Sequence, residues 1–279
     1  MGAEDRLLPP ILADRFETFS DELAGLFVDN FRRSDQQFSE KGERGELVSS
    51  FDRQLDERFF GFLARHFPEA RVVSEETPAA WPPGEEDTWL IDPLDGTHNF
   101  LAGFPLCGAM AVLIRRRVAV FTAIFLPLER ALGRSGLYIA GRGFGAWQWQ
   151  NPKPIRLAVS RQADIAKAFL LLEGPTKALS ESPAVARLIT ATRRSRNNLS
   201  VCLSAVSVAR GGLVPAGVDL LVSVGNQPWD NLPAALLVKE AGGRVSDHRG
   251  NPWSVENYSD LVFSNGLLHD ATLIITKGE

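Results

Sequence analysis

Two aspartates at the end of an apolar run are the residues of this chain best suited to chemistry. Asp92 directly follows the apolar run 89–91, which predicts the end of a buried strand, and Asp95 lies three positions farther along. Packing alone has no use for two acids there, whereas hard cations such as Mg²⁺ take carboxylate and phosphate oxygens as ligands. The segment therefore predicts a site for a divalent cation and a phosphate group.

The other residues of this segment suit the same chemistry. Pro93 fixes its own φ at about −65° and stiffens the turn, which leaves the Leu94 carbonyl free to act as another oxygen ligand. Gly96 lets the backbone approach a ligand closely. Residues 97–100 predict the start of a helix, where free N–H groups can bind phosphate. A helix cap would explain one aspartate but not the second.

Further carboxylates are expected from two other places in the chain. Glu75 and Glu76 follow a short β-branched run, which indicates another strand end. Asp230 directly precedes an apolar helix predicted over 232–240, which two glycines end. A solvated loop and a simple helix cap are the alternatives for these acids. With the first two aspartates they predict a site for two or three metal ions, as used in phosphoryl displacement.

Four segments occur in a characteristic order along the chain. They are LVSSFD at 47–52, SEET at 74–77, WLIDPLDGT at 89–97, and a segment at 229–243 that begins with Trp-Asp and ends with Lys-Glu-Ala-Gly-Gly. These segments resemble the motifs of the inositol monophosphatase family of Mg²⁺-dependent, lithium-sensitive phosphatases. The resemblance extends from about residue 22 to about residue 267 and so covers nearly the whole chain.

The resemblance implies a fold and a division of the chain. The implied fold combines α+β and α/β parts in a layered αβαβα sandwich of the inositol monophosphatase/fructose-1,6-bisphosphatase type. Residues 1–150 would form an α+β half that carries most of the metal ligands. Residues 151–279 would form an α/β half that carries Asp230 and the segments that recognise the substrate.

The resemblance also implies which residues bind metal. Glu75, Asp92 and the Leu94 carbonyl resemble the ligands of a first ion. Asp92, Asp95 and Asp230 resemble the ligands of a second ion, so that Asp92 would bridge the two. A metal ion lowers the pKa of bound water and supplies a nucleophile near neutral pH. The implied cofactor is two or three Mg²⁺ ions.

Further roles follow from the same resemblance. Thr97 and Asp52 resemble the hydrogen-bonded pair that, together with Glu75, orients and deprotonates the attacking water. The N–H groups of Gly96 and Thr97 would hold the phosphate. Lys41 occupies the position of a lysine in a mobile loop near a third ion, and a solvated lysine is the alternative. The small phosphorylated substrate would then be hydrolysed by metal-activated water.

Another phosphatase class can be rejected from the sequence. Haloacid-dehalogenase-type phosphatases use Asp-x-Asp-Gly-Thr, in which the first aspartate is the nucleophile. Counting back from Gly96 and Thr97, that position is Pro93, which cannot form an acyl-phosphate. We therefore expect direct attack by water and no covalent phospho-enzyme.

The segments that would recognise the substrate fit the family less well. Inositol-selective members have a Gly-Thr-Ala-Ala-type helix start and a glutamate before the Trp-Asp motif, and both contact ring hydroxyls. The corresponding positions here are a segment that starts with Ser204 and Ala205, and Ser223, and a serine accepts hydrogen bonds less strongly than a carboxylate. We predict that inositol 1-phosphate is not the preferred substrate.

Several functions remain as alternatives. Within enzymes, the substrate could be a 3′-phosphoadenosine nucleotide, fructose 1,6-bisphosphate or histidinol phosphate. Outside enzymes, the chain could be a non-catalytic regulatory binding protein of the same fold. All the expected carboxylates and Thr97 are present, which favours catalysis.

Composition is consistent with a compact enzyme. The chain has 279 residues, of which 44% are hydrophobic, and a net charge of −4, which argues against a dedicated nucleic-acid binder. Cys107 and Cys202 lie in apolar segments and are expected to be buried free thiols in a reducing cytoplasm. No run approaches the roughly 18 apolar residues that span a membrane. A homodimer is expected by family analogy alone.

Hydrophobic periodicity predicts the elements that position these residues. Apolar residues at helical spacing predict helices over 23–31 and 55–63, and the β-branched stretch 106–145 predicts antiparallel strands. Further elements are predicted as a strand over 168–172, a helix over 183–192 and a strand over 220–224. A cluster of Arg193, Arg194 and Arg196 is expected on the surface, and gripping a second substrate phosphate is its alternative role.

Overall fold

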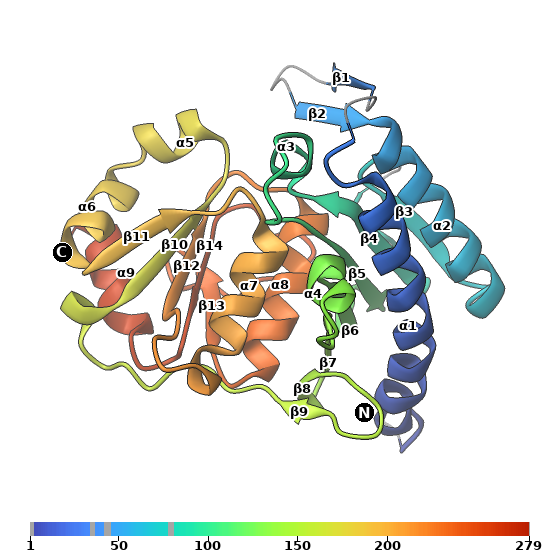
Figure 1. Cartoon of the computed structure of the whole chain (residues 1–279). Coiled ribbons are helices and arrows are strands. Elements are labelled where there is room, and N and C mark those ends of the chain that lie inside the picture. The colour runs from blue at the N-terminus through green and yellow to red at the C-terminus, as the bar shows by residue number, and fades with distance from the viewer. Residues whose placement is uncertain (1–2, 34–36, 42–45, 78–80, 279) are drawn as a thin grey trace.

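The elements of this protein are arranged in five layers (Figure 1). The structure is a computed structural model, and it describes residues 3–33, 37–41, 46–77 and 81–278. Helices cover the outer face of each of two sheets, and a further pair of helices lies between the sheets. The predicted layered αβαβα sandwich is confirmed.

The first layer contains α1 (Ala3–Asn30) and α2 (Ser50–His66), and a short hairpin of β1 (Phe38–Lys41) and β2 (Glu46–Ser49) lies before α2. Ser49 caps α2 by accepting hydrogen bonds from two backbone N–H groups, and the Asp52 carboxylate in turn accepts a hydrogen bond from the Ser49 N–H. Leu55, Phe59 and Leu63 bury one face of α2. Both helices predicted in this part of the chain are confirmed.

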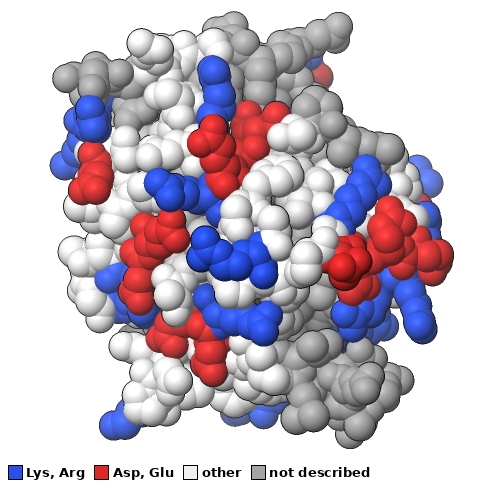
Figure 2. Space-filling view, turned by 90° about the vertical axis from the view of Figure 1, so that its right-hand side faces the viewer, with Lys and Arg blue, Asp and Glu red and all other residues white. Residues whose placement is uncertain are grey.

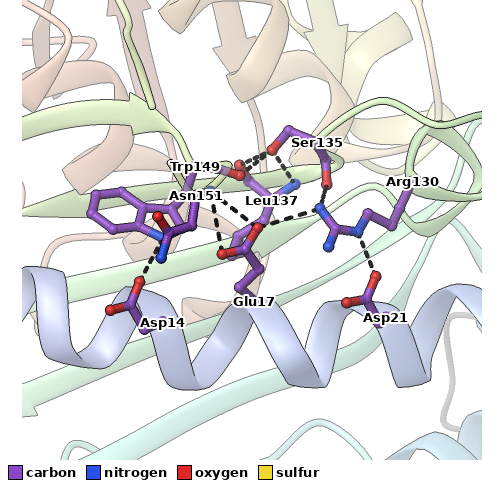
Figure 3. Close-up of polar contacts among 8 residues, drawn as sticks. All are labelled: Asp14, Glu17, Asp21, Arg130, Ser135, Leu137, Trp149 and Asn151. Carbon is purple, nitrogen blue, oxygen red and sulfur yellow. Dashed lines mark hydrogen bonds and ion pairs between the residues drawn. The ribbon is translucent and has the colours of Figure 1, made fainter. Parts of the chain in front are cut away.

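Polar contacts join α1 to the sheet beneath it (Figure 3). The Arg130 guanidinium of α4 (Pro127–Ala131) donates to Asp21 at 2.7 Å and pairs with Glu17 at 3.7 Å. The Trp149 indole N–H donates to Asp14 at 3.3 Å. These contacts line one side of α1 and fix its position along the sheet.

The second layer is a seven-stranded sheet in the order β3-β4-β5-β6-β7-β8-β9. Its strands are β3 (Arg71–Ser74), β4 (Thr88–Asp95), β5 (Gly108–Arg115), β6 (Val118–Phe125), β7 (Leu137–Gly141), β8 (Gly145–Gln148) and β9 (Ile155–Arg156). All neighbouring strands are antiparallel except β3 and β4, so the antiparallel strands predicted over 106–145 are confirmed. Both faces of β4 are buried, which explains its continuous apolar run.

The central layer contains α7 (Val201–Ala209) and α8 (Pro228–Glu240). Both helices contact strands of both sheets, and residues 231–238 of α8 are all buried, which explains why this stretch is apolar on nearly every side. At the end of α8, Glu240 accepts hydrogen bonds of 3.0 Å from the N–H groups of Gly143 and Gly145 in the β7–β8 hairpin. The helix is therefore fixed to the first sheet at its C-terminus.

The fourth layer is a five-stranded sheet in the order β11-β10-β12-β14-β13. Its strands are β10 (Phe169–Glu173), β11 (Arg194–Asn197), β12 (Leu220–Ser223), β13 (Arg244–Asp247) and β14 (Leu261–Ser264). Strands β11 and β12 run parallel to β10, whereas β14 is antiparallel to both of its neighbours. The two strands predicted in this half are confirmed as β10 and β12.

Helices α5 (Thr176–Glu181), α6 (Pro183–Ala191) and α9 (His269–Lys277) form the outer layer on this side. Val185, Leu188 and Leu273 pack on the apolar outer face of the sheet. The helix predicted over 183–192 is therefore confirmed. The first sheet ends at Arg156 and the second begins at Phe169, while α8 packs on both, so the division into halves near residue 150 stays a prediction.

The surface over α1 and α2 carries mixed charge. Figure 2 shows Lys and Arg side chains interspersed with Asp and Glu side chains on this face. Among the described residues, no helix has the length and apolar character that a membrane crossing requires. Cys107 and Cys202 are buried free thiols, as predicted.

Candidate metal centre

Four carboxylates from three elements converge between the two sheets. Asp92 and Asp95 lie at the end of β4, and Asp230 lies in the first turn of α8. One carboxylate oxygen of each of these three lies within 4.8 Å of the others. Glu75 directly follows β3, which is parallel to β4, and its side chain contacts Asp92. Parallel strands end at the same sheet edge, so the two strand-end acids meet there.

Asp92 lies at the centre of this group. It is 1% exposed, and it contacts the side chains of both Glu75 and Asp230. Burial raises the pKa of Asp92 well above its ordinary value, and the negative charges of Glu75, Asp95 and Asp230 raise it further. A central carboxylate with neighbours on two sides is suited to bridging two cations.

Asp230 has two roles in the structure. Its carboxylate accepts a hydrogen bond of 2.8 Å from the Gln227 N–H and so caps α8. It also faces the other acids, and its pKa is raised well above the ordinary value by burial and by Glu75 and Asp95. Asp230 therefore caps α8, as the alternative predicted, and also belongs to the group of carboxylates.

Asp95 is held by the N-terminus of α7. Its carboxylate accepts hydrogen bonds of 3.0 Å from the N–H groups of Val201 and Cys202, and a short one from the Ser200 hydroxyl. The sequence analysis missed this contact. Ser200 directly before the apolar run 201–203 is an N-cap signal that could have located the helix start.

Asp52 and Thr97 meet although they are 45 positions apart in the chain. The Thr97 hydroxyl is 2.9 Å from Asp52 Oδ1 and 3.0 Å from the Leu94 carbonyl oxygen. Burial is the main cause of a raised pKa at Asp52. The predicted contact is present, and its role in handling water stays a prediction.

Gly96 forms the turn between β4 and α3 (Thr97–Leu101), whose predicted start is confirmed. Its φ is +87°, a value that side chains disfavour, and a Cβ there would lie 2.8 Å from the Leu106 carbonyl oxygen. Glycine is therefore required here. Gly96 and Thr97 both line the cavity next to the acids, where the sequence predicted phosphate binding.

Glu173, the last residue of β10, is a fifth acid that the sequence analysis overlooked. It is 2% exposed and accepts hydrogen bonds from the N–H groups of Asn198 and Ser200 and from the Ser204 hydroxyl. Burial, with a further contribution from the Asp95 charge, raises the pKa of Glu173 to about 8. Glu173 directly follows the apolar run 169–172, and this is the same pattern that identified Asp92, so it could have located Glu173 as well.

These residues line a cavity of about 200 Å³. In the described part of the chain, its lining has five carboxylates and neither lysine nor arginine: Glu75, Asp92, Asp95, Glu173 and Asp230. His98 also lines the cavity and is otherwise exposed. An anionic phosphate ester would be repelled by this lining unless cations offset the charge.

The predicted helix start at Ser204 is wrong. Helix α7 begins at Val201, three residues earlier and directly after its N-cap Ser200, so Ser204 and Ala205 lie within the helix and are fully buried. Ser204 was matched to the family's helix start by resemblance alone, whereas the N–H groups of Val201 and Cys202, which donate to Asp95, mark the observed start. Leu199 and Ser200 line the cavity instead.

The remaining predicted residues lie farther from the acids or outside the description. Ser223 is buried at the end of β12, where its hydroxyl donates to Asn231 and accepts from Asn226, a cavity residue. Ser223 could therefore act only through Asn226. Lys41 ends β1, but its side chain lies outside the described residues. Glu76 does not line the cavity.

Comparison with known proteins gives a consistent result. The family model described as "Inositol monophosphatase family" matches residues 17–277. A "Fructose-1,6-bisphosphatase/inositol-1-monophosphatase" of Aquifex aeolicus is 30% identical over 258 residues, which cover 87% of this chain and 86% of that protein.

Solved structures share the fold. An IMPase of Thermotoga maritima has a TM-score of 0.79 and 26% identity, covering 95% of this chain and 97% of that one. An "IMPase/NADP phosphatase complexed with Mg2+ and phosphate" has a TM-score of 0.76 and 20% identity, covering 95% of this chain and 93% of that one. At 20% identity, the second likeness concerns the fold alone.

Proposed function

This chain belongs to the inositol monophosphatase family and is a phosphatase, and we propose that it is a Mg²⁺-dependent phosphomonoesterase of small phosphorylated metabolites. The observation that carries this proposal is the cavity with five carboxylates and, among the described residues, no lysine or arginine. An anionic ester can bind there only with cations. The five carboxylates would allow the ester to bind by holding these cations.

The donor atoms fit Mg²⁺. Carboxylate oxygens and a carbonyl oxygen are the ligands that this hard cation prefers, and imidazole or thiolate donors would favour other metals. We assign two or three ions to Glu75, Asp92, the Leu94 carbonyl, Asp95 and Asp230. When bound, Mg²⁺ lowers the pKa of water and offsets the negative charge of the phosphate group.

The side chains next to the acids would handle the attacking water. Thr97 and Asp52 are hydrogen-bonded to each other, and with Glu75 they would orient the water and accept its proton. The raised pKa of Asp52 makes it a better proton acceptor than an ordinary aspartate. Water attacks phosphorus and gives its proton to these carboxylates, the ester P–O bond breaks, and the leaving alkoxide takes up a proton from solvent, so that the alcohol and inorganic phosphate leave. The N–H groups of Gly96 and Thr97 would hold the phosphate during this displacement.

The alcohol part of the substrate would meet a largely uncharged wall. Leu199, Asn226 and Trp229 line the cavity, whereas the position expected to hold a glutamate is the buried Ser223. We therefore propose that inositol 1-phosphate is hydrolysed but is not preferred. A 3′-phosphoadenosine nucleotide, fructose 1,6-bisphosphate and histidinol phosphate remain candidates. Lithium inhibition and a homodimer remain predictions from the family, and a cytoplasmic location remains a prediction from the use of cysteine.

Phosphate release from a substrate panel tests the proposed function. Purified protein is assayed with each candidate phosphate ester, with Mg²⁺ and with EDTA in its place. We expect release by the wild type only with Mg²⁺, and a loss of at least 100-fold in Asp95→Asn, because the variant loses a charged metal ligand. Asp29→Asn, an exposed acid on α1, is the matched control and should keep full activity. Folded wild-type protein that is inert on every ester would instead favour a regulatory binding protein.

A further inference from the structure

A second cavity, of about 610 Å³, lies at the opposite end of the five-stranded sheet from the acidic cavity. Phe169, the first residue of β10, lines the second cavity, whereas Glu173, the last residue of β10, lines the acidic one. Helix α7 likewise has Ser200 of the acidic cavity before its start and Gly211 of the second cavity after its end. The two cavities are therefore separated by the length of a strand and of a helix.

Closely packed backbone forms one wall of this cavity. The Gly212 N–H donates to the Ala158 carbonyl at 2.8 Å, and a Cβ on Gly212 would lie 2.6 Å from the Val159 carbonyl oxygen. A Cβ on Gly217 would lie 2.1 Å from the Gly211 carbonyl oxygen. Side chains cannot fill this wall, so the space beside it is a property of the backbone.

Positive charge dominates the cavity lining. Its basic residues are Arg161, Lys167, Arg193 and Arg194. Within the described parts of the chain, none of the three arginine guanidinium groups has a carboxylate partner. Lys167 pairs with Asp164 at 3.3 Å, and both of these side chains are largely exposed.

The acid in the lining, Asp219, already has hydrogen-bond partners in the wall. It is buried, and its two carboxylate oxygens accept from the Ser160 hydroxyl and from the Phe169 N–H at 2.8 Å. The Asp219 carboxylate is therefore bound to groups of the cavity wall and does not pair with the arginine side chains. Among the residues that the structure describes, the cavity thus presents to solvent three guanidinium groups that have no carboxylate partner.

We propose that this cavity binds a small phosphorylated metabolite that carries at least two negative charges. Guanidinium groups form paired hydrogen bonds with phosphate oxygens, and several cations around one cavity favour a ligand with several charges. The volume lies within the range of small-molecule sites. The site differs from the metal centre in both position and sign of charge.

The opposite charges of the two cavities provide a clean test with the full-length chain. The protein is stripped of metal with EDTA and dialysed into metal-free buffer that lacks EDTA, because EDTA is itself an anion. The acidic cavity then repels anions, so isothermal titration with pyrophosphate reports on the basic cavity alone. We expect one equivalent to bind, with an affinity that falls as the salt concentration rises. Arg194→Ala and Arg161→Ala should each weaken binding at least tenfold, and both residues are exposed, so the variants should fold.

Arg196→Ala is the matched control, because Arg196 is exposed on the same strand as Arg194 but does not line the cavity. Its affinity for pyrophosphate should equal that of the wild type. An absence of binding at millimolar pyrophosphate would overturn the proposal, as would an equal loss in Arg196→Ala. Neither the metal nor phosphatase activity enters this readout, so its failure is independent of the proposed function.

Discussion

Leu199 adopts an unusual backbone conformation next to the metal centre. Its φ is +53°, which costs a non-glycine residue about 1–2 kcal/mol. The Leu199 N–H donates to the Asn197 side chain, and its carbonyl accepts from Asn99, so these contacts hold the strained turn. A leucine side chain thus forms part of the wall of the acidic cavity.

We predict that Leu199→Gly makes the enzyme more tolerant of hydroxylated substrates. Removal of the apolar side chain should raise kcat/KM for inositol 1-phosphate relative to p-nitrophenyl phosphate by several-fold, a difference of about 1 kcal/mol. The backbone strain would be relieved, so thermal stability should be unchanged or higher. Leu199→Ala is the control, since it keeps the positive φ and should be less stable than Leu199→Gly. An unchanged substrate ratio in both variants would contradict a role in specificity.

Glu173 makes the stability of the metal-free protein depend on pH. Its pKa is about 8 in the folded state and near the ordinary 4.5 when unfolded. Between these values the folded state holds a proton that the unfolded state has lost, so this group lowers the unfolding free energy as the pH rises. The loss is fully developed above about pH 8 and amounts to a few kcal/mol at about 1.4 kcal/mol per pKa unit.

Glu173→Gln tests this prediction, because glutamine stays neutral at every pH. The melting temperature of the wild type minus that of the variant, measured in EDTA, should become smaller or reverse in sign between pH 5 and pH 9. Glu181→Gln, an exposed glutamate on α5, is the control and should show no such trend. A difference for Glu173→Gln that stays constant over this range would show that the buried acid does not titrate there.

At the scale of elements, the turn before α7 joins the two sheets. It receives Asp95 from β4, Glu173 from β10 and Asn99 from α3. Asn99 is 5% exposed and donates to the carbonyl oxygens of Leu106 and Asn198 at 2.7 Å and of Leu199 at 3.1 Å. One buried side chain thus holds three segments together next to the metal centre.

We predict that Asn99→Ala lowers both stability and activity. Loss of the amide leaves buried carbonyls without a donor, at a cost of about 1–3 kcal/mol, and the turn that holds Asp95 loosens, so kcat should fall. Thermal unfolding and steady-state kinetics measure the two effects. Asn251→Ala is the control, because it loses a hydrogen bond to Asp247 outside the cavity lining and should reduce stability alone. Full kcat in Asn99→Ala would show that the turn does not depend on this contact.

The elements around the site differ in how well the sequence predicts them. Asp92 and Glu75 could be predicted because each follows a run of residues that is typical of a strand end. This pattern is local in the sequence. The start of α7 was misplaced because the resemblance to the family motif put it at Ser204, whereas the contact that marks the true start comes from Asp95, more than 100 positions away. Contacts of this length are set by the packing of layers, which no local pattern contains.

Arg194 illustrates the same limit. It lies only six positions before Ser200, so the sequence suggested that it could grip a substrate phosphate. The strand β11 rises about 3.3 Å per residue and carries the chain from one end of the sheet's strands to the other. Arg194 therefore lies at the basic cavity and Ser200 at the acidic one, although the two residues are close in sequence.

At the scale of the whole molecule, the proposed metal ligands come from different layers of the fold. Asp92 and Asp95 belong to the first sheet, whereas Asp230 begins the central helix α8, which packs on both sheets. Without cations these carboxylates repel one another, and burial raises the pKa of each. Binding of Mg²⁺ to the folded state alone would therefore stabilise the entire molecule, by about 2.7 kcal/mol at a concentration of 100 Kd.

Thermal unfolding of the wild type and Asp230→Asn, each with EDTA and with Mg²⁺, tests the shared metal centre most directly. We predict that the variant melts at a higher temperature than the wild type in EDTA, because one charge of the repelling group is gone. With Mg²⁺ the order should reverse, since only the wild type keeps the full ligand set and gains several degrees, while Asp29→Asn should follow the wild type throughout. An equal Mg²⁺-dependent gain in the wild type and Asp230→Asn would contradict the account.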